Sequence, residues 1–330
     1  MGKQGTGEEM RRPLFFGRLA NLRKSSAAIR QKFRRIAPLR KLRALFQLAT
    51  NLPEHLVLQR VLAHPSVVIL AESQPNLRFK YLHSNYLARS LSTRCRLKIL
   101  SSHYRFLQTH LSPEFLMQAY RAGHTLWRDQ DEGNTMDIVL TFPKGHDYEG
   151  DLRLDFRVGT TPVYTLTFSI IAGALLGMTD GKMAGEQVLL VSGVQGIPGQ
   201  IAPIRQATKM CHDTSPAYLL LAAAQALALS LDINMIVGLG KKEQVSSRED
   251  DFPVAGFVFD YDGFWQSFAL GSLPGREGFY RVPLPIPEKP LETMHAKRRG
   301  RAMRRREMRK RISDEVGRQI GGRYCSGNEA

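Results

Sequence analysis

Two short stretches of this 330-residue chain hold side chains that could carry out chemistry, and the first contains Lys209, Cys211 and His212. His212 could act as a catalytic base or a ligand, Lys209 could bind a substrate, and Cys211 could be a nucleophile. On a helix, adjacent side chains point about 100° apart, so Cys211 and His212 could not pair with each other. A buried structural thiol and a histidine that caps a helix end are the structural alternatives.

The second stretch, residues 260–265, places two carboxylates beside aromatic rings. Asp262 is the candidate catalytic acid or base here, with Tyr261 and Trp265 as the candidate substrate-binding residues. The structural alternative is that the aspartates form Asx-turns and that Trp265 anchors a core.

A glycine loop, Gln195-Gly-Ile-Pro-Gly199, separates an apolar run from a helical one. This order is similar to the acyl-CoA cradle of GNAT-type acetyltransferases, in which N–H groups at a helix N-terminus hold the pyrophosphate. Gln195, Gly196 and Gly199 are therefore the candidate cofactor-binding residues, and acyl-CoA is the candidate cofactor. The spacing differs, because that fold has a glycine three residues after the glutamine, and Pro198 has no N–H to donate. A tight turn that needs glycine is the alternative.

These candidates depend on an α/β unit between residues 186 and 240. The run 186–196 is rich in Val and Leu and predicts a buried strand. Ser215-Pro216 predicts the start of a helix that is apolar on every side up to Leu231, and 233–239 predicts a second strand. Such a helix has to be buried, so we expect the two strands to be parallel neighbours with a right-handed crossover.

The rest of the chain predicts an α/β (α+β) fold. Helical periodicity prevails up to residue 125, and alternating runs then predict antiparallel strands. The uncharged run 158–179 is long enough to span a membrane, but its glycines, threonines and Pro162 favour two strands around a turn or short helix. We expect a basic amphipathic helical extension (1–50), a helical subdomain (51–125), a mixed, GNAT-like α/β core with the buried helix (126–290), and a basic C-terminal helix and tail (291–330).

Positive charge gathers at the two ends of the chain. Residues 1–50 hold 13 Lys and Arg against 2 Glu, and residues 297–311 hold 10 against Glu307, whereas the whole chain carries +17. The expected partner is an anionic membrane surface, and nucleic acid is the alternative. The amphipathic region 14–49 could pack its apolar side on the core or lie in a membrane surface.

The three cysteines lie far apart, without a CxxC pair, so we expect neither a metal site nor a disulfide framework. Such sparse cysteine use suits a reducing cytosol. No signal peptide is recognisable, because Arg and Lys interrupt the region that follows Arg11-Arg12. The expected location is cytoplasmic, with attachment to the periphery of the inner membrane as the extension of that hypothesis.

Eight short motifs follow one another along the chain: His103-Tyr104, Tyr164-Thr-Leu-Thr-Phe168, Val194-Gln195-Gly196, Ala207-Thr208-Lys209 with His212, Pro216, Tyr261-Asp262-Gly-Phe-Trp265, Val282-Pro283 and Lys297-Arg298. As a set they resemble the VirK/YbjX family of Gram-negative bacteria, which is built on a domain of unknown function. Two positions depart from the family pattern, with Asp213 in place of a glycine and Ser215 in place of a basic residue.

The resemblance implies a cytoplasmic or inner-membrane-associated protein linked to virulence, envelope or lipid A homeostasis and resistance to cationic antimicrobial peptides. The resemblance does not imply any particular reaction. If the protein is an enzyme, the layout of the core predicts an acyl-CoA-dependent N- or O-acyltransferase. The alternatives are a nucleic-acid-binding or stress-response protein that uses the basic ends, and a non-catalytic scaffold.

Overall fold

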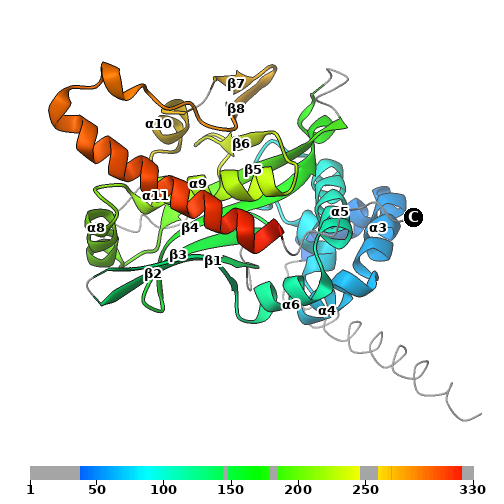
Figure 1. Cartoon of the computed structure of the whole chain (residues 1–330). Helices are drawn as coiled ribbons and strands as arrows, with labels where there is room; N and C mark the ends of the chain where they lie inside the picture. Colours follow the sequence, from blue (N-terminus) through cyan, green and yellow to red (C-terminus); the bar gives the residue numbers. More distant parts are fainter. Residues whose placement is uncertain are drawn as a thin grey trace, which may run out of the picture.

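The computed structural model describes residues 38–131, 133–143, 148–178, 185–245, 259–268 and 270–321 (Figure 1). The first part is helical, with α2 (Pro38–Thr50), α3 (Leu52–Leu62), α4 (Pro65–Ser73), the 3₁₀ helix η1 (Leu77–Leu82), α5 (Thr93–His110) and α6 (Pro113–Arg121). The strands are β1 (His124–Asp131), β2 (Asn134–Thr141), β3 (Leu152–Val158), β4 (Thr161–Ala172), β5 (Gln187–Gly196), β6 (Ile236–Leu239), β7 (Ser272–Leu273) and β8 (Arg276–Val282). The other helices are η2 (Gly173–Leu176), α8 (Ile201–Met210), α9 (Pro216–Ser230), α10 (Tyr261–Gln266), η3 (Leu291–Thr293) and α11 (Ala296–Gly321).

The described strands form one eight-stranded sheet in the order β1-β2-β3-β4-β5-β6-β8-β7. Neighbours are antiparallel except for β5 and β6, which pair in parallel through residues 189–191 and 236–238. The predicted mixed α/β architecture and the predicted parallel pair are therefore confirmed. The strand expected at 254–259 falls largely on residues outside the described part of the chain.

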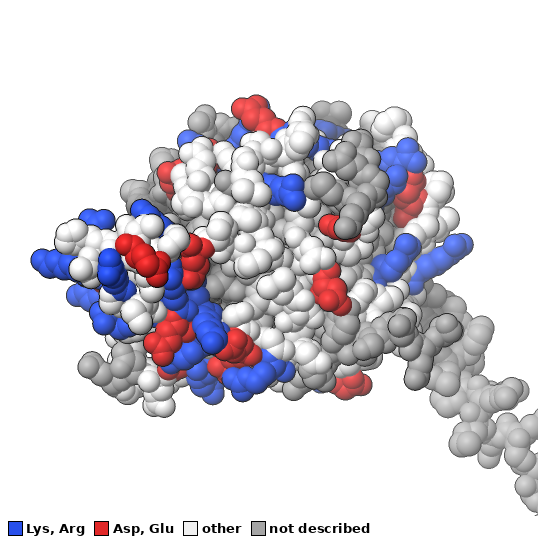
Figure 2. Space-filling model, turned by 45° about the horizontal axis from the view of Figure 1, so that its top comes forward, with Lys and Arg blue, Asp and Glu red and all other residues white. Residues whose placement is uncertain are grey.

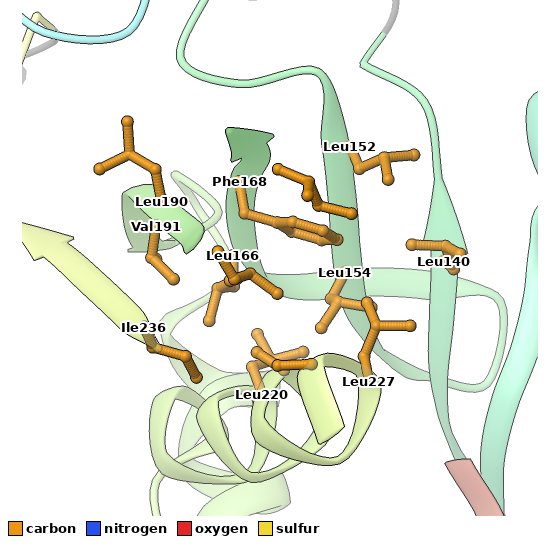
Figure 3. Close-up of a cluster of buried hydrophobic side chains, with 14 of the residues drawn as sticks. Leu140, Leu152, Leu154, Leu166, Phe168, Leu190, Val191, Leu220, Leu227 and Ile236 are labelled. Atoms are coloured by element: carbon orange, nitrogen blue, oxygen red, sulfur yellow. The ribbon is translucent and has the colours of Figure 1, made fainter. Parts of the chain in front are cut away.

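Helix α9 is the buried helix that the sequence predicted. Pro216 occupies its first turn, and its Ala- and Leu-rich sequence favours a helix. It ends in a Schellman motif, in which the N–H of Ile233 donates to Ala228 O while Asp232 adopts a positive φ of 54°. Figure 3 shows Leu220 and Leu227 of α9 directed toward leucines of the sheet. Each such fully buried leucine contributes about 1.5–3 kcal/mol of hydrophobic stabilisation.

The long basic helix α11 lies across α9 and reaches β1 (Figure 1). Its polar sequence contains an apolar residue every four positions in the second half, and these four side chains are buried: Met308, Ile312, Val316 and Ile320. This i, i+4 spacing puts them in one row on the helix face that meets the core. The predicted C-terminal helix is therefore also part of the packed structure.

The N-terminal helices gather at one end of the sheet, where α5 packs on β4 (Figure 1). The uncharged run 158–179 forms the strand β4 and the short helix η2, whereas the second of the two strands expected around the helix, β5, begins only at Gln187. Its predicted turn at 179–182 lies outside the described residues, as does most of the amphipathic region 14–49. Within the described part, no single helix is long and apolar enough to cross a membrane, although the pair Leu52–Leu62 and Pro65–Ser73, bent by 105°, passes on length and composition together.

Candidate functional site

Asp262 and Trp265 tie the short helix α10 to the end of β6. The Asp262 carboxylate accepts hydrogen bonds from the Lys241 N–H at 3.2 Å and from the Tyr280 hydroxyl at 3.1 Å. Trp265 is fully buried, and its indole N–H donates to Leu239 O at 2.8 Å. Asp260 caps the helix by accepting from the Gly263 N–H at 3.0 Å. Through these contacts, Asp262 and Trp265 position helix α10 against β6 and β8.

His212 and Lys209 lie at the C-terminal end of α8, where Lys209 is exposed and His212 is half-buried. His212 and Asp213 both have positive φ, 55° and 57°, a region that favours glycine. The Arg305 side chain from α11 donates to the carbonyl oxygens of both residues, at 3.0 and 2.7 Å. Cys211 is fully buried, with its sulfur 3.6 Å from that of Met136. Arg305 thus links this loop to α11.

Gln195, Gly196 and Gly199 form the end of β5 and the turn into α8. A Cβ at Gly196 would lie 2.9 Å from Ile204 and 3.3 Å from the Tyr164 ring, so glycine permits α8 to approach closely. Gly199 has a φ of 79°, which glycine adopts without strain. Helix α8 separates this turn from His212 by ten residues, about 15 Å at the α-helical rise.

The predicted site residues therefore form three groups: the glycine turn, helix α10 and the loop with His212. Only the first two are connected by contacts in the described part of the chain. Tyr164 of β4, which pairs with Gly196 at the end of β5, is linked to α10 through aromatic rings: its centroid lies 6.3 Å from that of Phe259, and that of Phe259 lies 4.9 Å from that of Tyr261. Tyr261, Asp262 and Trp265 share α10. The contacts of His212 that the structure describes run to α11, and we find none that joins it to Asp262.

Sequence reasoning missed a carboxylate beside the predicted glycine loop. Beyond Val191 and Gly238 the parallel pairing of β5 with β6 stops, and β5 continues along β4 with a bulge at Ser192. Glu149, 9% exposed, lies at this bulge, since a Cβ at Gly193 would be 2.5 Å from its carboxylate. Gln195 donates to the same carboxylate at 3.4 Å. Glu149 follows a segment without strand periodicity, so no local pattern indicates its place.

A second missed feature is a buried polar network between the helical region and the sheet. The Asp151 carboxylate accepts from the Lys80 ammonium at 3.0 Å, the Tyr86 hydroxyl at 2.6 Å and the Ser169 hydroxyl at 2.6 Å. Lys80 also donates to Gly150 O. Nearby, His103 Nδ1 accepts from the Ile170 N–H at 3.1 Å, while its Nε2 atom has no hydrogen-bond partner among the described residues. The motif residue His103 thus lies in the interior rather than in an accessible cleft.

The electrostatics of this network follow from its burial. Burial alone would raise the pKa of Asp151, but the Lys80 ammonium, His103 and the two hydroxyl donors outweigh it and leave this pKa below its ordinary value. Burial lowers the pKa of His103 to about 4, so its imidazole is neutral at pH 7. Burial, followed by the neighbouring Asp151 charge, raises the pKa of Tyr86 well above its ordinary value. The network therefore contains a charged Lys–Asp pair and neutral partners.

Four arginines of α11 form ion pairs with carboxylates from other parts of the chain. Arg301 pairs with Asp213 at 3.4 Å, and Arg311 pairs with Asp129 at 3.2 Å. Arg306 and Arg309 both contact the Glu288 carboxylate. Figure 2 shows Lys and Arg gathered over the first half of α11 with Asp and Glu among them. This basic surface is thus partly neutralised.

Helix α2 presents the opposite arrangement. Leu42, Leu45 and Phe46 occupy one helical face and are 66%, 52% and 67% exposed. Lys41 and Arg43 lie beside them on the same helix, without an ion pair in the described part of the chain. Exposed large apolar side chains continue on α3, at Leu52, Leu56 and Val57. Within the described part of α2, these three apolar side chains are therefore not buried in the core.

The described residues define a mixed α/β protein with N-terminal helices at one end of an eight-stranded sheet, and they contain no cluster of His, Cys, Asp or Glu that could hold a metal ion. The chain belongs to the family described as "Protein of unknown function (DUF535)", whose model matches residues 36–318.

Two relatives support this assignment and confirm the resemblance seen in the motifs. The chain is 28% identical over 264 residues to the uncharacterised protein YbjX of Escherichia coli K12, with 78% of this chain and 76% of that one aligned. It is 27% identical over 195 residues to a protein named Membrane protein LapB of Mannheimia haemolytica, with 57% and 77% aligned. No solved structure matches the chain.

Proposed function

We propose that this protein works on the surface of an anionic membrane, as a cytoplasmic and inner-membrane-peripheral factor in envelope or lipid A homeostasis. The observation that carries the proposal is the exposed apolar face of α2, Leu42, Leu45 and Phe46, with Lys41 and Arg43 beside it. An apolar face flanked by cations is the arrangement by which helices lie in a membrane interface. A role in virulence and in resistance to antimicrobial peptides would follow from this envelope function.

The magnitudes are sufficient for reversible attachment. Each large apolar side chain that leaves water contributes about 1.5–3 kcal/mol, and each cation near an anionic surface about 1 kcal/mol. The three apolar residues and two cations of α2 therefore supply several kcal/mol before any contribution from α3. The name of the Mannheimia haemolytica relative, Membrane protein LapB, agrees with this setting.

Vesicle flotation with the full chain tests the proposal. Binding to vesicles with phosphatidylglycerol should exceed binding to phosphatidylcholine vesicles, and added salt should weaken it. Leu42→Ser/Phe46→Ser should reduce binding at least tenfold, whereas Leu270→Ser, at an equally exposed leucine (68%) elsewhere, should not. Equal binding to both vesicle types, or an unaffected double variant, would refute the proposal. Tight, steeply salt-dependent binding to DNA or RNA without lipid preference would favour the nucleic-acid alternative.

A second candidate is an acyl-CoA-dependent N- or O-acyltransferase activity of the core. The end of the β5–β6 pairing at Val191 and Gly238, the glycine loop with Gln195, Gly196 and Gly199, and the Glu149 carboxylate at the bulge favour it. In this hypothesis Glu149 would be the general base near the acyl group, and His212 and Asp262 would act from the surrounding loops. Lys209, Tyr261 and Trp265 would contact or position the substrate.

Isothermal titration with acyl-CoA tests this second candidate directly. Micromolar binding in the wild type that is weakened by Gln195→Ala would support it, with Gln206→Ala on the exposed side of α8 as the matched control. Glu149→Gln should retain binding and lose acyl transfer. A flat titration with short-chain and long-chain acyl-CoA would favour the non-catalytic scaffold instead.

A further inference from the structure

A groove lies between α3, α5 and the segment that joins β4 to η2. Its volume is about 590 Å³, within the range of pockets that hold small ligands. The apolar part of its lining comes from Val57 of α3, Phe106 of α5 and Leu175 of η2. Val57 is itself 37% exposed and belongs, with Leu52 and Leu56, to the exposed apolar residues of α3, so the groove opens beside these residues.

A row of polar side chains runs along the α5 side of this groove. Lys98, Ser102 and Arg105 are spaced i, i+4 and i+7, which places them on one helical face over about 10 Å. Ordinary solvent-exposed helix faces also carry such residues, but this row forms one wall of a groove whose opposite wall is α3. It therefore faces a confined and partly apolar space.

The cations of the groove outnumber its acidic residues. Glu54 is the acidic residue among its described lining residues; it forms an ion pair with Arg94 at 2.5 Å, and the charge of Lys98 also acts on its carboxylate. Neither Lys98 nor Arg105 forms an ion pair within the described part of the chain. Two cations beside an apolar floor are complementary to a ligand with an anionic head and a hydrocarbon chain.

We infer that this groove binds one anionic membrane lipid with a phosphate head group, whose phosphate contacts Lys98, Ser102 and Arg105 while a chain lies on Val57, Phe106 and Leu175. The inference rests on the proposed membrane attachment, because the lipid would enter from the surface on which the protein lies. Charge-assisted hydrogen bonds from lysine and arginine give the head group its affinity and orientation. The chain adds affinity through the apolar area that it removes from water.

The experiment uses the full chain and dodecyl phosphate below its critical micelle concentration, with binding measured by isothermal titration. Lys98→Gln/Arg105→Gln should weaken binding at least tenfold, whereas Arg121→Gln/Arg281→Gln, which removes the same charge at exposed positions outside the groove, should not. Ala174→Trp should block the groove, and Ala202→Trp, at another exposed alanine, should leave binding unchanged. Circular dichroism and melting temperature establish that each variant is folded.

Two comparison probes separate this site from simpler ones. If inorganic phosphate bound as tightly as dodecyl phosphate, the hydrocarbon chain would be irrelevant and the inference would be overturned. If dodecylphosphocholine bound as tightly, the net negative charge would be irrelevant, which would overturn it as well. Ala174→Trp should retain flotation with anionic vesicles, and Leu42→Ser/Phe46→Ser should retain dodecyl phosphate binding. Failure of the groove and failure of membrane attachment are therefore distinguishable, and unchanged dodecyl phosphate binding in Ala174→Trp would refute the groove alone.

Discussion

Replacing Asp151 with asparagine should lower the free energy of unfolding by about 3–5 kcal/mol. In the native protein the carboxylate is 1% exposed and accepts hydrogen bonds from Lys80, Tyr86 and Ser169. Asparagine keeps the shape but removes the negative charge, which leaves the Lys80 ammonium, 8% exposed, without a counter-ion. Removing one partner of a buried ion pair has an effect of this size because the other charge stays desolvated.

Guanidinium titration measures the effect through intrinsic fluorescence. Both tryptophans of the chain, Trp127 and Trp265, are buried, so their emission should change on unfolding. A loss of about 4 kcal/mol is a large part of the 5–15 kcal/mol that usually stabilises a domain, so the midpoint should shift strongly. Glu277→Gln is the matched control, because its ion pair with Lys242 is exposed and should contribute nothing measurable.

The pairing itself is tested by a double-mutant cycle. Lys80→Met/Asp151→Asn should be less destabilised than the sum of the two single variants, because no unpaired charge is left in the interior. The lowered pKa of Asp151 also determines how the stability of the protein depends on pH. The pKa of Asp151 is lowered in the native state, so its contribution is present above the unfolded-state pKa and is lost as the pH falls through the native one. If Asp151→Asn lowered the free energy of unfolding by less than about 1 kcal/mol, the buried Lys80–Asp151 ion pair would be refuted, because effects of that size are typical of exposed ion pairs.

Three further changes test other parts of the structure. Because burial lowers the pKa of His103 to about 4 from 6.5, only the unfolded chain gains a proton between these values, and stability should fall by up to about 3 kcal/mol as the pH drops across them. His103→Asn should flatten this slope in urea titrations, and an unchanged slope would contradict the assignment. A Cβ at Gly238 would lie 2.3 Å from the Trp265 ring, so Gly238→Ala should lower the melting temperature by several degrees, unlike Gly185→Ala, where nothing lies within 4 Å. Asp213→Gly should be about 1 kcal/mol more stable to denaturant than Asp213→Ala, because only glycine adopts the φ of 57° without strain, and equal stabilities would contradict that strain.

The central α/β unit could be predicted because its signals are local. A helix without a polar side, such as α9, has to be covered, and the strands β5 and β6 on either side of it then have to share a sheet. The family motifs also indicated the correct relatives. The strand boundaries were predicted less exactly. Strand β6 begins at Ile236 and not at the predicted Ile233, because the N–H of Ile233 is still part of the Schellman motif that ends α9.

The candidate site was harder to predict from residue types alone. Asp262 and Trp265 looked like a carboxylate with an aromatic platform, and both make contacts that position α10 on β6 and β8. Glu149, which has no motif around it, lies beside the predicted glycine loop because the chain folds back across β4 and β5. Side-chain chemistry can be read from sequence, whereas side-chain neighbours depend on which strands pair.

By itself, the sequence determined the family, the helical beginning, the buried helix and the placement of positive charge at the two ends. These features follow from composition and from the spacing of apolar residues by two to four positions, so they depend on residues that are close together in the sequence. Only the tertiary structure decided that Lys80 meets Asp151 across 71 positions, that four arginines of α11 form ion pairs with distant carboxylates, and that Leu42, Leu45 and Phe46 of α2 are exposed. Contacts between distant residues depend on the packing of the whole molecule, and no local period encodes them.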